Sequence, residues 1–513
     1  MTIALAAGDE TQPLLRTDRN KGPPHDVADP ADPADTIIVD FDPRGDAENP
    51  LEWPTPFKWT IVSMLAFMAF TVTFTCISPV PLASDIVRDL SGSSTPSKSS
   101  SVLLVTIWEL GEAAGPLLIA PLSELHGRYR VMNAANVLFV GATVLAATSA
   151  SVAQLVAARM LTGLAVAGNV LNPAIVGDVF AREERGSALS LIYLAPLVGG
   201  AAGPLVASAV AQAYGWRAVV WMAAALSAAC EVLFLTCFRE TYKVAILRRR
   251  AAAMAAHAAG SGKTFRTAFD DDAEAVGRGE RAAGWRALRD AVLRPAVVLF
   301  GSGVLLVMSL FAAVVFTFFY VMSTTLGDIL ADRYHLSPIA VGSCYAVFSL
   351  GSTLSVFFCN HWLDRIYIRM RDAHKGVGQP EFRLPVAIVG GFLLPVAVLS
   401  YGWATELRLP LVLLLSSTCL IGVALMLGII PVMAYVVDAF GVYSASAMTG
   451  VIVMRCLMGT FLPLTTAPLV DRFGWGWGFT VFAGAILLTA PVPVLMLRYG
   501  AYWRRFSKYS RDA

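Results

Sequence analysis

Two acidic residues, Glu109 and Glu112, lie inside an apolar run that extends from about residue 101 to residue 122. A helix of this length can cross a bilayer, and an acidic side chain at its centre costs roughly 2.5 to 3.5 kcal/mol on insertion scales. Residues three apart lie on one face of a helix. The pair therefore predicts a site that handles ions or substrate, where a carboxylate could load and release a proton. The alternative is structural, a protonated acid that is hydrogen-bonded to neighbouring backbone.

The composition indicates what kind of protein positions these acids. Of the 513 residues, 56% are hydrophobic and only 15% are charged, whereas soluble domains average about 25% charged residues. This balance is typical of a polytopic membrane protein. The sequence has no nucleotide-binding phosphate loop, no serine nucleophile elbow and no His/Asp metal cluster, and its seven cysteines lie in apolar runs without a CxxC pair or His/Cys cluster. We expect a protein that is not an enzyme, has no metal or cofactor and binds no nucleic acid.

Twelve apolar windows are long enough to span the membrane, in two sets of six separated by a hydrophilic interval. The sequence thus predicts an all-α membrane protein with twelve transmembrane helices in two pseudo-symmetric six-helix bundles. The first set lies near residues 59–81, 101–122, 132–151, 153–179, 187–210 and 217–238, and the second near 297–323, 338–359, 384–404, 410–436, 445–467 and 476–498.

The basic residues predict the direction of these spans. With a cytosolic N-terminus, 31 of the 39 Lys and Arg residues fall on the cytosolic side and six on the opposite side, while Arg159 and Arg455 lie inside spans. Because basic loops favour the cytosol, we expect both termini and the central loop there. Arg159 and Arg455 are possible counter-charges for Glu109 and Glu112, and we include Arg159 with the two acids as a proton-coupling residue. Glu231 in span 6 is a weaker candidate.

An internal repeat supports the division into two bundles. Asp178 after span 4 matches Asp438 after span 10 at an offset of 260, and Gly200 matches Gly459 at an offset of 259. Such repeats are typical of transporters whose two halves face each other across a central cavity. The expected domains are a disordered cytosolic tail (1–56), a first bundle (57–238), a cytosolic central loop (239–294), a second bundle (295–499) and a cytosolic C-terminal tail (500–513).

Short motifs occur before span 1 (residues 49–53), between spans 2 and 3 (115–130), in span 5 (199–204) and after span 6 (239–242). They resemble motifs of the major facilitator superfamily and, within it, the fungal twelve-span drug:proton antiporters. The likeness covers residues 46 to 510 or so. Two departures are Glu124, where an Asp is usual, and Ala207 with Ser208, where the span 5 motif often ends in two glycines.

The resemblance implies a gate at the loop between spans 2 and 3, a latch between the halves that breaks and reforms. Gly127 permits a tight turn, and the arginines beside it could pair with Glu124 or Asp178. The alternative is that these arginines only satisfy the topology rule. The predicted gating residues are Glu124, Gly127, Arg128, Arg130 and Asp178, with Asp364 and Arg365 as a weaker counterpart after span 8.

The motif of span 5 contains Gly199, Gly203 and Pro204. Proline removes one backbone hydrogen bond and the spaced glycines make a small face, so this helix can bend and pack closely on a neighbour. The resemblance adds a role in sealing the cavity against proton leak. For substrate contacts it points to spans 1, 4, 7 and 10. The predicted cavity residues are Asn169, Asn172, Tyr320, Tyr435 and Arg455, although packing could explain any one of them.

Together these observations predict a proton-coupled secondary active transporter that exports a small organic molecule, such as a drug, a secondary metabolite or an organic acid, by alternating access. A proton symporter or facilitator that imports a nutrient is the alternative, and a membrane receptor or enzyme is a remote one. The expected partners are the substrate, protons and the lipid bilayer. We expect a monomer with several spans in the plasma membrane and both termini in the cytoplasm.

Overall fold

The computed structural model of the chain describes residues 36–42, 45–92, 97–166, 168–181, 184–258, 264–267, 289, 292–507 and 509–510.

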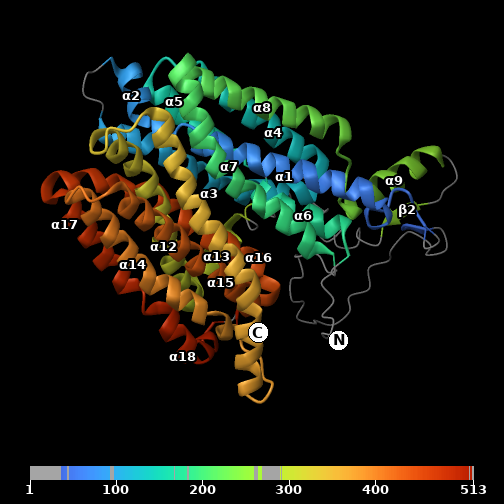
Figure 1. Ribbon diagram of the computed structural model, residues 1–513. Coiled ribbons are helices and arrows are strands. Elements are labelled where there is room, and N and C mark those ends of the chain that lie inside the picture. Colours follow the sequence, from blue (N-terminus) through green and yellow to red (C-terminus); the bar gives the residue numbers. More distant parts are fainter. Residues whose placement is uncertain are drawn as a thin grey trace.

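Helices from the first half of the sequence form one bundle, and helices from the second half form another beside it (Figure 1). The first bundle contains α1 (Thr55–Ile77), α2 (Ala83–Ser91), α3 (Lys98–His126), α4 (Arg128–Ala147), α5 (Val152–Leu164), α6 (Gly168–Val179), α7 (Arg185–Tyr214) and α8 (Trp216–Cys237). The second contains α12 (Gly303–Asp332), α13 (Pro338–Ala373), α14 (Pro385–Glu406), α15 (Leu411–Phe440), α16 (Ser444–Phe461), α17 (Thr466–Thr489) and α18 (Val492–Arg504).

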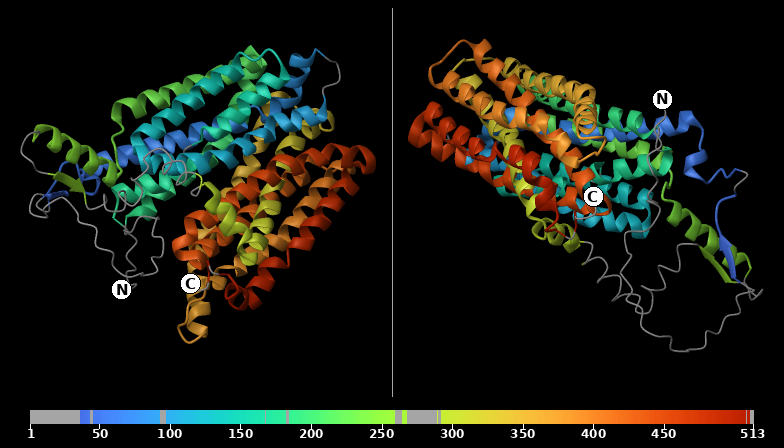
Figure 2. Two further views of the ribbon diagram at one scale, coloured as in Figure 1. Left: turned by 180° about the vertical axis from the view of Figure 1, so that it is seen from behind. Right: turned by 90° about the horizontal axis from the view of Figure 1, so that it is seen from below.

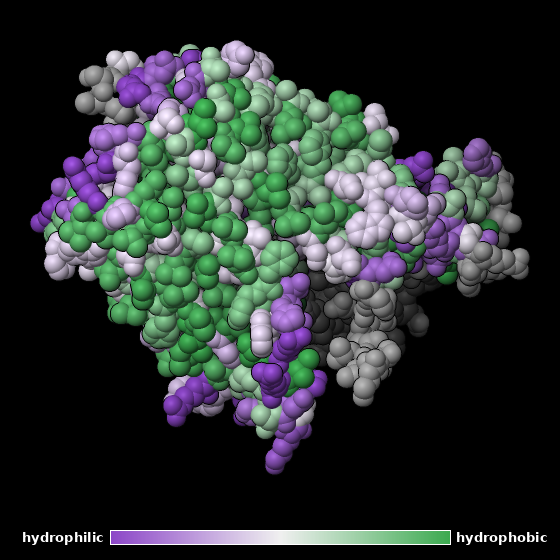
Figure 3. Space-filling view, viewed as in Figure 1, coloured by the Kyte–Doolittle hydropathy of each residue, from purple (hydrophilic) through white to green (hydrophobic). Residues whose placement is uncertain are grey.

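The twelve predicted spans are all helical. Within the described residues, ten helical segments are long and apolar enough to cross a membrane. Span 4 is not among the ten because it is divided into α5 and α6, and spans 11 and 12 lie in one continuous segment, Ser444–Arg504. Apolar side chains cover the broad middle of the surface, and hydrophilic ones gather at its two ends (Figure 3), as expected for a protein that crosses a bilayer.

The backbone confirms the internal repeat. Gly215, between α7 and α8, has φ 81° and ψ 167°, and Gly474, the matching residue inside α17, has φ 79° and ψ 174°. Positive φ is accessible to glycine at little cost. Both glycines turn the chain from one span into the next, so the repeat preserves the corners as well as the helices.

Two helix pairs make most of the contact between the halves. α3 packs against α16, and α7 packs against α13. Small residues permit the close approach: a side-chain carbon added to Gly342 of α13 would lie 2.5 Å from the carbonyl oxygen of Pro204 in α7. Such small contact residues are typical of membrane helices that associate through van der Waals packing.

Two ends of the molecule can be named from this arrangement. The terminal end carries residues 45–54, α9 (Lys243–His257) and residues 505–507, whereas the opposite end carries α2 and Gly474. The two bundles diverge toward the terminal end, as the left view of Figure 2 shows.

The expectation of a disordered tail over residues 1–56 is wrong for its described part. Strand β1 (Thr36–Val39) pairs in parallel with β2 (Thr264–Thr267) of the central loop. Asp46 is 8% exposed, and Arg250 of α9 donates to it over 2.7 Å. This hydrogen bond is the main reason why the pKa of Asp46 lies below its ordinary value of 3.8. Residues 1–35 and 43–44 lie outside the described part.

Candidate functional site

A cavity of about 280 Å³ lies between the two halves. Its walls come from α1, α3 and α7 of the first half and from α12, α13, α15 and α16 of the second. Aromatic rings dominate the second-half wall, where Phe319 lies 5.1 Å from Phe348 between ring centroids. The charged groups of the lining are Glu109, Glu112 and Arg455, so both acids singled out in the sequence face a cavity large enough for a small molecule.

Glu112 forms an ion pair across the boundary between the halves. The Nη2 atom of Arg455 lies 3.0 Å from its Oε1 atom, and the indole nitrogen of Trp108 donates to its Oε2 atom over 3.2 Å. The guanidinium of Arg455 also lies 4.2 Å from the ring centroid of Phe316. The prediction of Arg455 as a counter-charge therefore agrees with the geometry, and α3 of the first half is tied to α16 of the second.

Glu109 makes a second bridge between the halves. The hydroxyl of Tyr320 in α12 donates to its Oε1 atom over 2.7 Å. Its Oε2 atom is buried without a hydrogen-bond partner, and the whole residue is only 1% exposed. A buried carboxylate oxygen without a partner is costly, so this oxygen is a place where a proton or another ligand would be stabilised.

Arg159 does not take the place that the sequence suggested. Its guanidinium donates to the carbonyl oxygens of Leu104 at 3.3 Å, Thr75 at 3.1 Å and Cys76 at 2.8 Å. These acceptors belong to α1 and α3. Arg159 therefore ties three helices of the first half together instead of neutralising the acids, because its charge is satisfied by backbone dipoles.

The predicted cavity residues divide into two groups. Tyr320 and Arg455 line the cavity. Tyr435 is fully buried, within electrostatic range of Glu381 and Arg504. Asn172 is 5% exposed in α6 and its Oδ1 atom has no hydrogen-bond partner. Neither belongs to the cavity lining of the described residues. The side chain of Asn169 lies outside the described part.

The arginine of the loop after span 2 lies in a cluster within the first half. The Nε atom of Arg128 lies 3.5 Å from Asp178, and its guanidinium also donates to Ser123 and lies over the ring of Tyr242. Gly127, with φ 90°, turns the chain so that the first backbone nitrogens of α4 reach the carboxylate of Glu240, at 2.8 and 3.2 Å. A carboxylate at a helix N-terminus is stabilised by the free N–H groups.

A matching cluster occurs in the second half, around a different residue from the one predicted. Arg383 donates to Asp438 over 2.5 Å and to Asp364 over 3.0 Å. Arg365 is not the partner of Asp364 in this cluster, because its guanidinium lies over the ring of Trp362. Asp438 matches Asp178 in the repeat, so Arg383 is the counterpart of Arg128.

In this conformation the contacts of Arg128 and of Arg383 join helices of one half only, so they hold each half together at the terminal end. The expected latch between the halves, which breaks and reforms, therefore stays a prediction. Glu124 and Arg130 are exposed at this end. Sequence reasoning missed Glu240 and Arg383 as cluster residues, although Glu240 lies in the motif noted after span 6. The acidic side chain in that motif was the available signal.

The motif of α7 packs on helices of both halves. A side-chain carbon at Gly199 would lie 2.9 Å from the carbonyl oxygen of Phe70, and one at Gly203 would lie 3.3 Å from the Oγ atom of Ser78, both in or next to α1. Pro204 lies against Gly342 of α13. The small face predicted from the sequence is therefore used for close packing, and the contact of Pro204 with Gly342 lies at the boundary between the halves.

The halves are also joined at the opposite end. Lys98 of α3 forms an ion pair of 2.6 Å with Asp471 of α17, and Ser84 of α2 donates to Asp328 of α12 over 3.0 Å. Polar contacts between described residues of the two halves thus occur at the cavity and at the opposite end.

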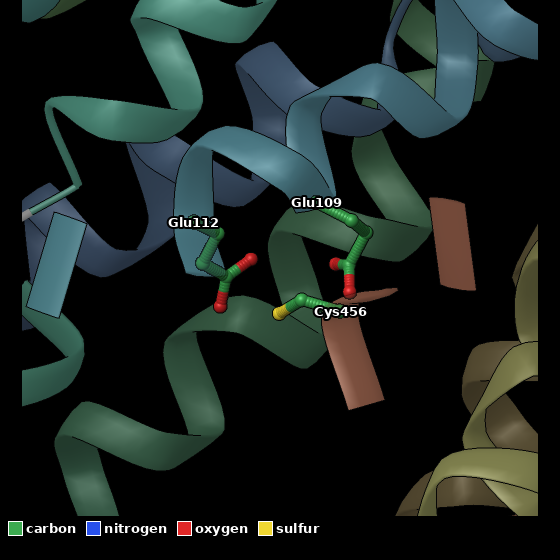
Figure 4. Close-up of side chains that lie close together, drawn as sticks. All are labelled: Glu109, Glu112 and Cys456. Carbon is green, nitrogen blue, oxygen red and sulfur yellow. The ribbon is translucent and has the colours of Figure 1, made fainter. Parts of the chain in front are cut away.

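One group of side chains at the edge of the cavity has the chemistry of a metal site. Ligand atoms of Glu109, Glu112 and Cys456 lie within 4.8 Å of one another, and all three residues are buried (Figure 4). No spacing in the sequence predicts this group, because Cys456 is separated from the acids by more than half of the chain.

Duplicated six-helix bundles around a central polar and aromatic cavity define a membrane transporter. The family model described as "Major Facilitator Superfamily" matches residues 59–463. The chain therefore belongs to the major facilitator superfamily.

The chain is similar in sequence to transporters of fungi. The chain is 30% identical over 493 residues to the MFS transporter cpaT of Aspergillus oryzae, with 96% of each chain covered. It is 31% identical over 477 residues to the efflux pump radE of Floropilus chiversii, covering 93% of this chain and 86% of the other. Among solved structures, a D-xylose–proton symporter superposes with a TM-score of 0.64 at 16% identity, covering 90% of this chain and 100% of that one. The last likeness concerns the fold alone.

Proposed function

We propose that this transporter exports a small organic molecule in exchange for protons, and that Glu109 and Glu112 carry those protons. The observation that carries the proposal is the pair of bridges at the cavity: Glu112 to Arg455 and Glu109 to Tyr320. Both bridges join an acid of one half to a residue of the other. Protonation of Glu112 removes its attraction to Arg455, so the same event that loads a proton loosens the boundary between the halves.

The terminal end faces the cytoplasm in this proposal, and the protein lies in the plasma membrane. The excess of basic residues on the loops and tails of that side supports the orientation. The contacts at the opposite end, Lys98 to Asp471 and Ser84 to Asp328, then close the cavity toward the outside. The conformation is the one that would accept a substrate from the cytoplasm, and transport requires these contacts to break while the terminal ends approach.

Export of a secondary metabolite or drug is the favoured direction, and two observations support it. A relative at 31% identity is named an efflux pump. The aromatic wall around Phe316, Phe319 and Phe348 suits a planar, largely apolar compound, since rings stack in offset or edge-to-face arrangements. Uptake of a nutrient with protons is the competing function, and the direction of transport separates the two.

The test measures that direction with the full chain in inside-out plasma-membrane vesicles of a yeast strain. A panel of planar aromatic compounds is supplied outside the vesicles, and the amount trapped inside is measured by mass spectrometry, with and without an inward-acidic pH gradient. The proposal predicts accumulation of at least one compound that collapses when a protonophore is added. Accumulation that ignores the gradient, or proton-driven release from the vesicles, would contradict it.

A further inference from the structure

We propose that a binding site for a thiophilic divalent metal ion, Zn²⁺ or Cd²⁺, lies at the edge of the cavity, formed by Glu109 and Glu112 of its lining and by the buried Cys456 beside them, and that metal binding there arrests transport. Figure 4 shows the two carboxylates of α3 and the thiol of α16 converging on one region. Ligand atoms around zinc lie 2.0 to 2.3 Å or so from the ion. Atoms within 4.8 Å of one another therefore need only small side-chain movements to bind it.

An unpartnered ligand atom supports this site independently of the cluster itself. The Oε2 atom of Glu109 is buried, has no hydrogen-bond partner and belongs to a residue that is 1% exposed. It lies beside α16, because a side-chain carbon at Gly459 would be 3.2 Å from it. A buried carboxylate oxygen in this position lacks the stabilisation that a cation would supply.

Neighbouring donors already hold the carboxylates in place. Tyr320 donates to the other oxygen of Glu109, and Trp108 and Arg455 donate to the two oxygens of Glu112. In metal sites, such outer hydrogen bonds orient the ligands and are worth about tenfold to a hundredfold in affinity. A carboxylate oxygen has two lone pairs, so each can accept one of these bonds and still bind a metal ion.

The charges of the group fit a divalent ion. With both acids ionised and Cys456 as a thiolate, three negative charges face the positive charge of Arg455, so one divalent cation makes the group neutral in a low-dielectric setting. A thiolate ligand favours Zn²⁺ and softer ions over Mg²⁺ or Ca²⁺. Binding forms a metal–sulfur bond and releases the thiol proton together with any proton on the acids, so affinity rises with pH.

The position of the three ligands explains why metal binding would arrest transport. Two belong to α3 and one to α16, so a bound ion ties the two halves together at the cavity. It also occupies the acids that bridge the halves. Both effects stop the alternation between states, whichever direction the substrate takes.

Metal binding is tested first, on the purified full chain in detergent. Cd²⁺ is titrated, and the thiolate-to-cadmium charge-transfer absorbance is recorded for the wild type, Cys456→Ser and the control Cys359→Ser, a second buried cysteine on α13. We expect the band in the wild type and the control, and its loss in Cys456→Ser with affinity at least about tenfold weaker. A band that survives in Cys456→Ser, or is absent from the wild type, overturns the proposal.

The second measurement is transport. Micromolar Zn²⁺ should slow wild-type transport and EDTA should restore it, whereas Cys456→Ser should transport at the wild-type rate and resist Zn²⁺ at least about tenfold better. Equal inhibition of the wild type and of Cys456→Ser by Zn²⁺ would overturn the proposal that metal binding at this site arrests transport. Because the binding measurement needs no transport, a failure of proton-driven export would leave the cadmium result to stand by itself.

Discussion

Two groups of charged residues in this transporter have different roles. The central seam, Glu109, Glu112, Tyr320 and Arg455, joins one half to the other at the cavity. The terminal clusters, around Arg128 in the first half and Arg383 in the second, join helices within a single half. The clusters follow the internal repeat, since Asp178 and Asp438 match, whereas the acids of the seam come from α3 and its cation from α16. Duplicated charge maintains the two bundles, and unduplicated charge lies where the bundles must move against each other.

The largest effect is expected from breaking the ion pair of the seam. Arg455→Met removes the cation of a buried ion pair with Glu112, and removing one member of such a pair costs about 3 to 5 kcal/mol. We expect a lowered thermal midpoint in detergent and loss of proton-driven transport. The double variant Glu112→Gln with Arg455→Met should recover most of the stability but not the transport. If Arg455→Met were as stable and as active as the wild type, the ion pair of the seam would have no role in stability or transport.

The hydrogen bond of Tyr320 between the halves can be compared with a matched hydrogen bond inside the second half. Tyr320→Phe removes a hydrogen bond to a carboxylate that crosses the boundary, worth about 1.5 to 3 kcal/mol. Tyr345→Phe removes a hydrogen bond to the carbonyl oxygen of Ser323 within the second half. We expect transport by Tyr320→Phe to change its pH dependence, and that by Tyr345→Phe to keep the wild-type profile. Identical pH profiles for the two variants would contradict the distinction.

Gly127 tests whether the terminal cluster around Arg128 stabilises the first half. Gly127→Ala places a side chain at φ 90° and against the carboxylate of Glu240, and left-handed backbone costs about 1 to 2 kcal/mol in other residues. The control Gly141→Ala has open space around it in the neighbouring helix α4. Thermal unfolding should show a loss for the first and none for the second. Equal midpoints would show that the turn tolerates a side chain.

The smallest effect concerns the contact between Asp46 and α9. Because the pKa of Asp46 is lowered by Arg250, this contact stabilises the folded segment above the ordinary value of 3.8 and is lost as the pH falls through the lower folded value. Asp46→Asn should speed hydrogen exchange in α9 at neutral pH, because the free energy of local unfolding falls by about 1 kcal/mol. The difference from the wild type should vanish once the pH falls below the lowered pKa of the folded state. A difference that persists at acid pH would exclude the ion pair as its cause.

The sequence predicted the fold well because the rules that govern it are local. Apolar length sets the twelve spans, and the offset between Gly215 and Gly474 reveals the repeat whose corners the backbone confirms. Arg455 was a correct counter-charge because few cations lie within spans. The same reasoning misplaced Arg159, since the sequence does not show that three backbone carbonyl oxygens converge on it.

What the sequence could not supply were contacts between distant parts of the chain. The position of Arg383 beside Asp438, and of Cys456 beside Glu109, depends on how helices pack and not on any spacing in the sequence. The same applies to β1 and β2, which are four residues each and pair although they are far apart in the chain. In each case a short signal was present, but only the packed structure identifies the partner.

If the acids of the seam couple protons to substrate movement, neutralising one of them should separate substrate exchange from proton-driven accumulation. Proteoliposomes with Glu109→Gln or with Glu112→Gln are each compared with the wild type in two measurements: exchange of substrate at equal concentrations, and accumulation driven by a pH gradient. We expect at least one variant to keep exchange while losing accumulation. Accumulation at the wild-type level in both variants would contradict it.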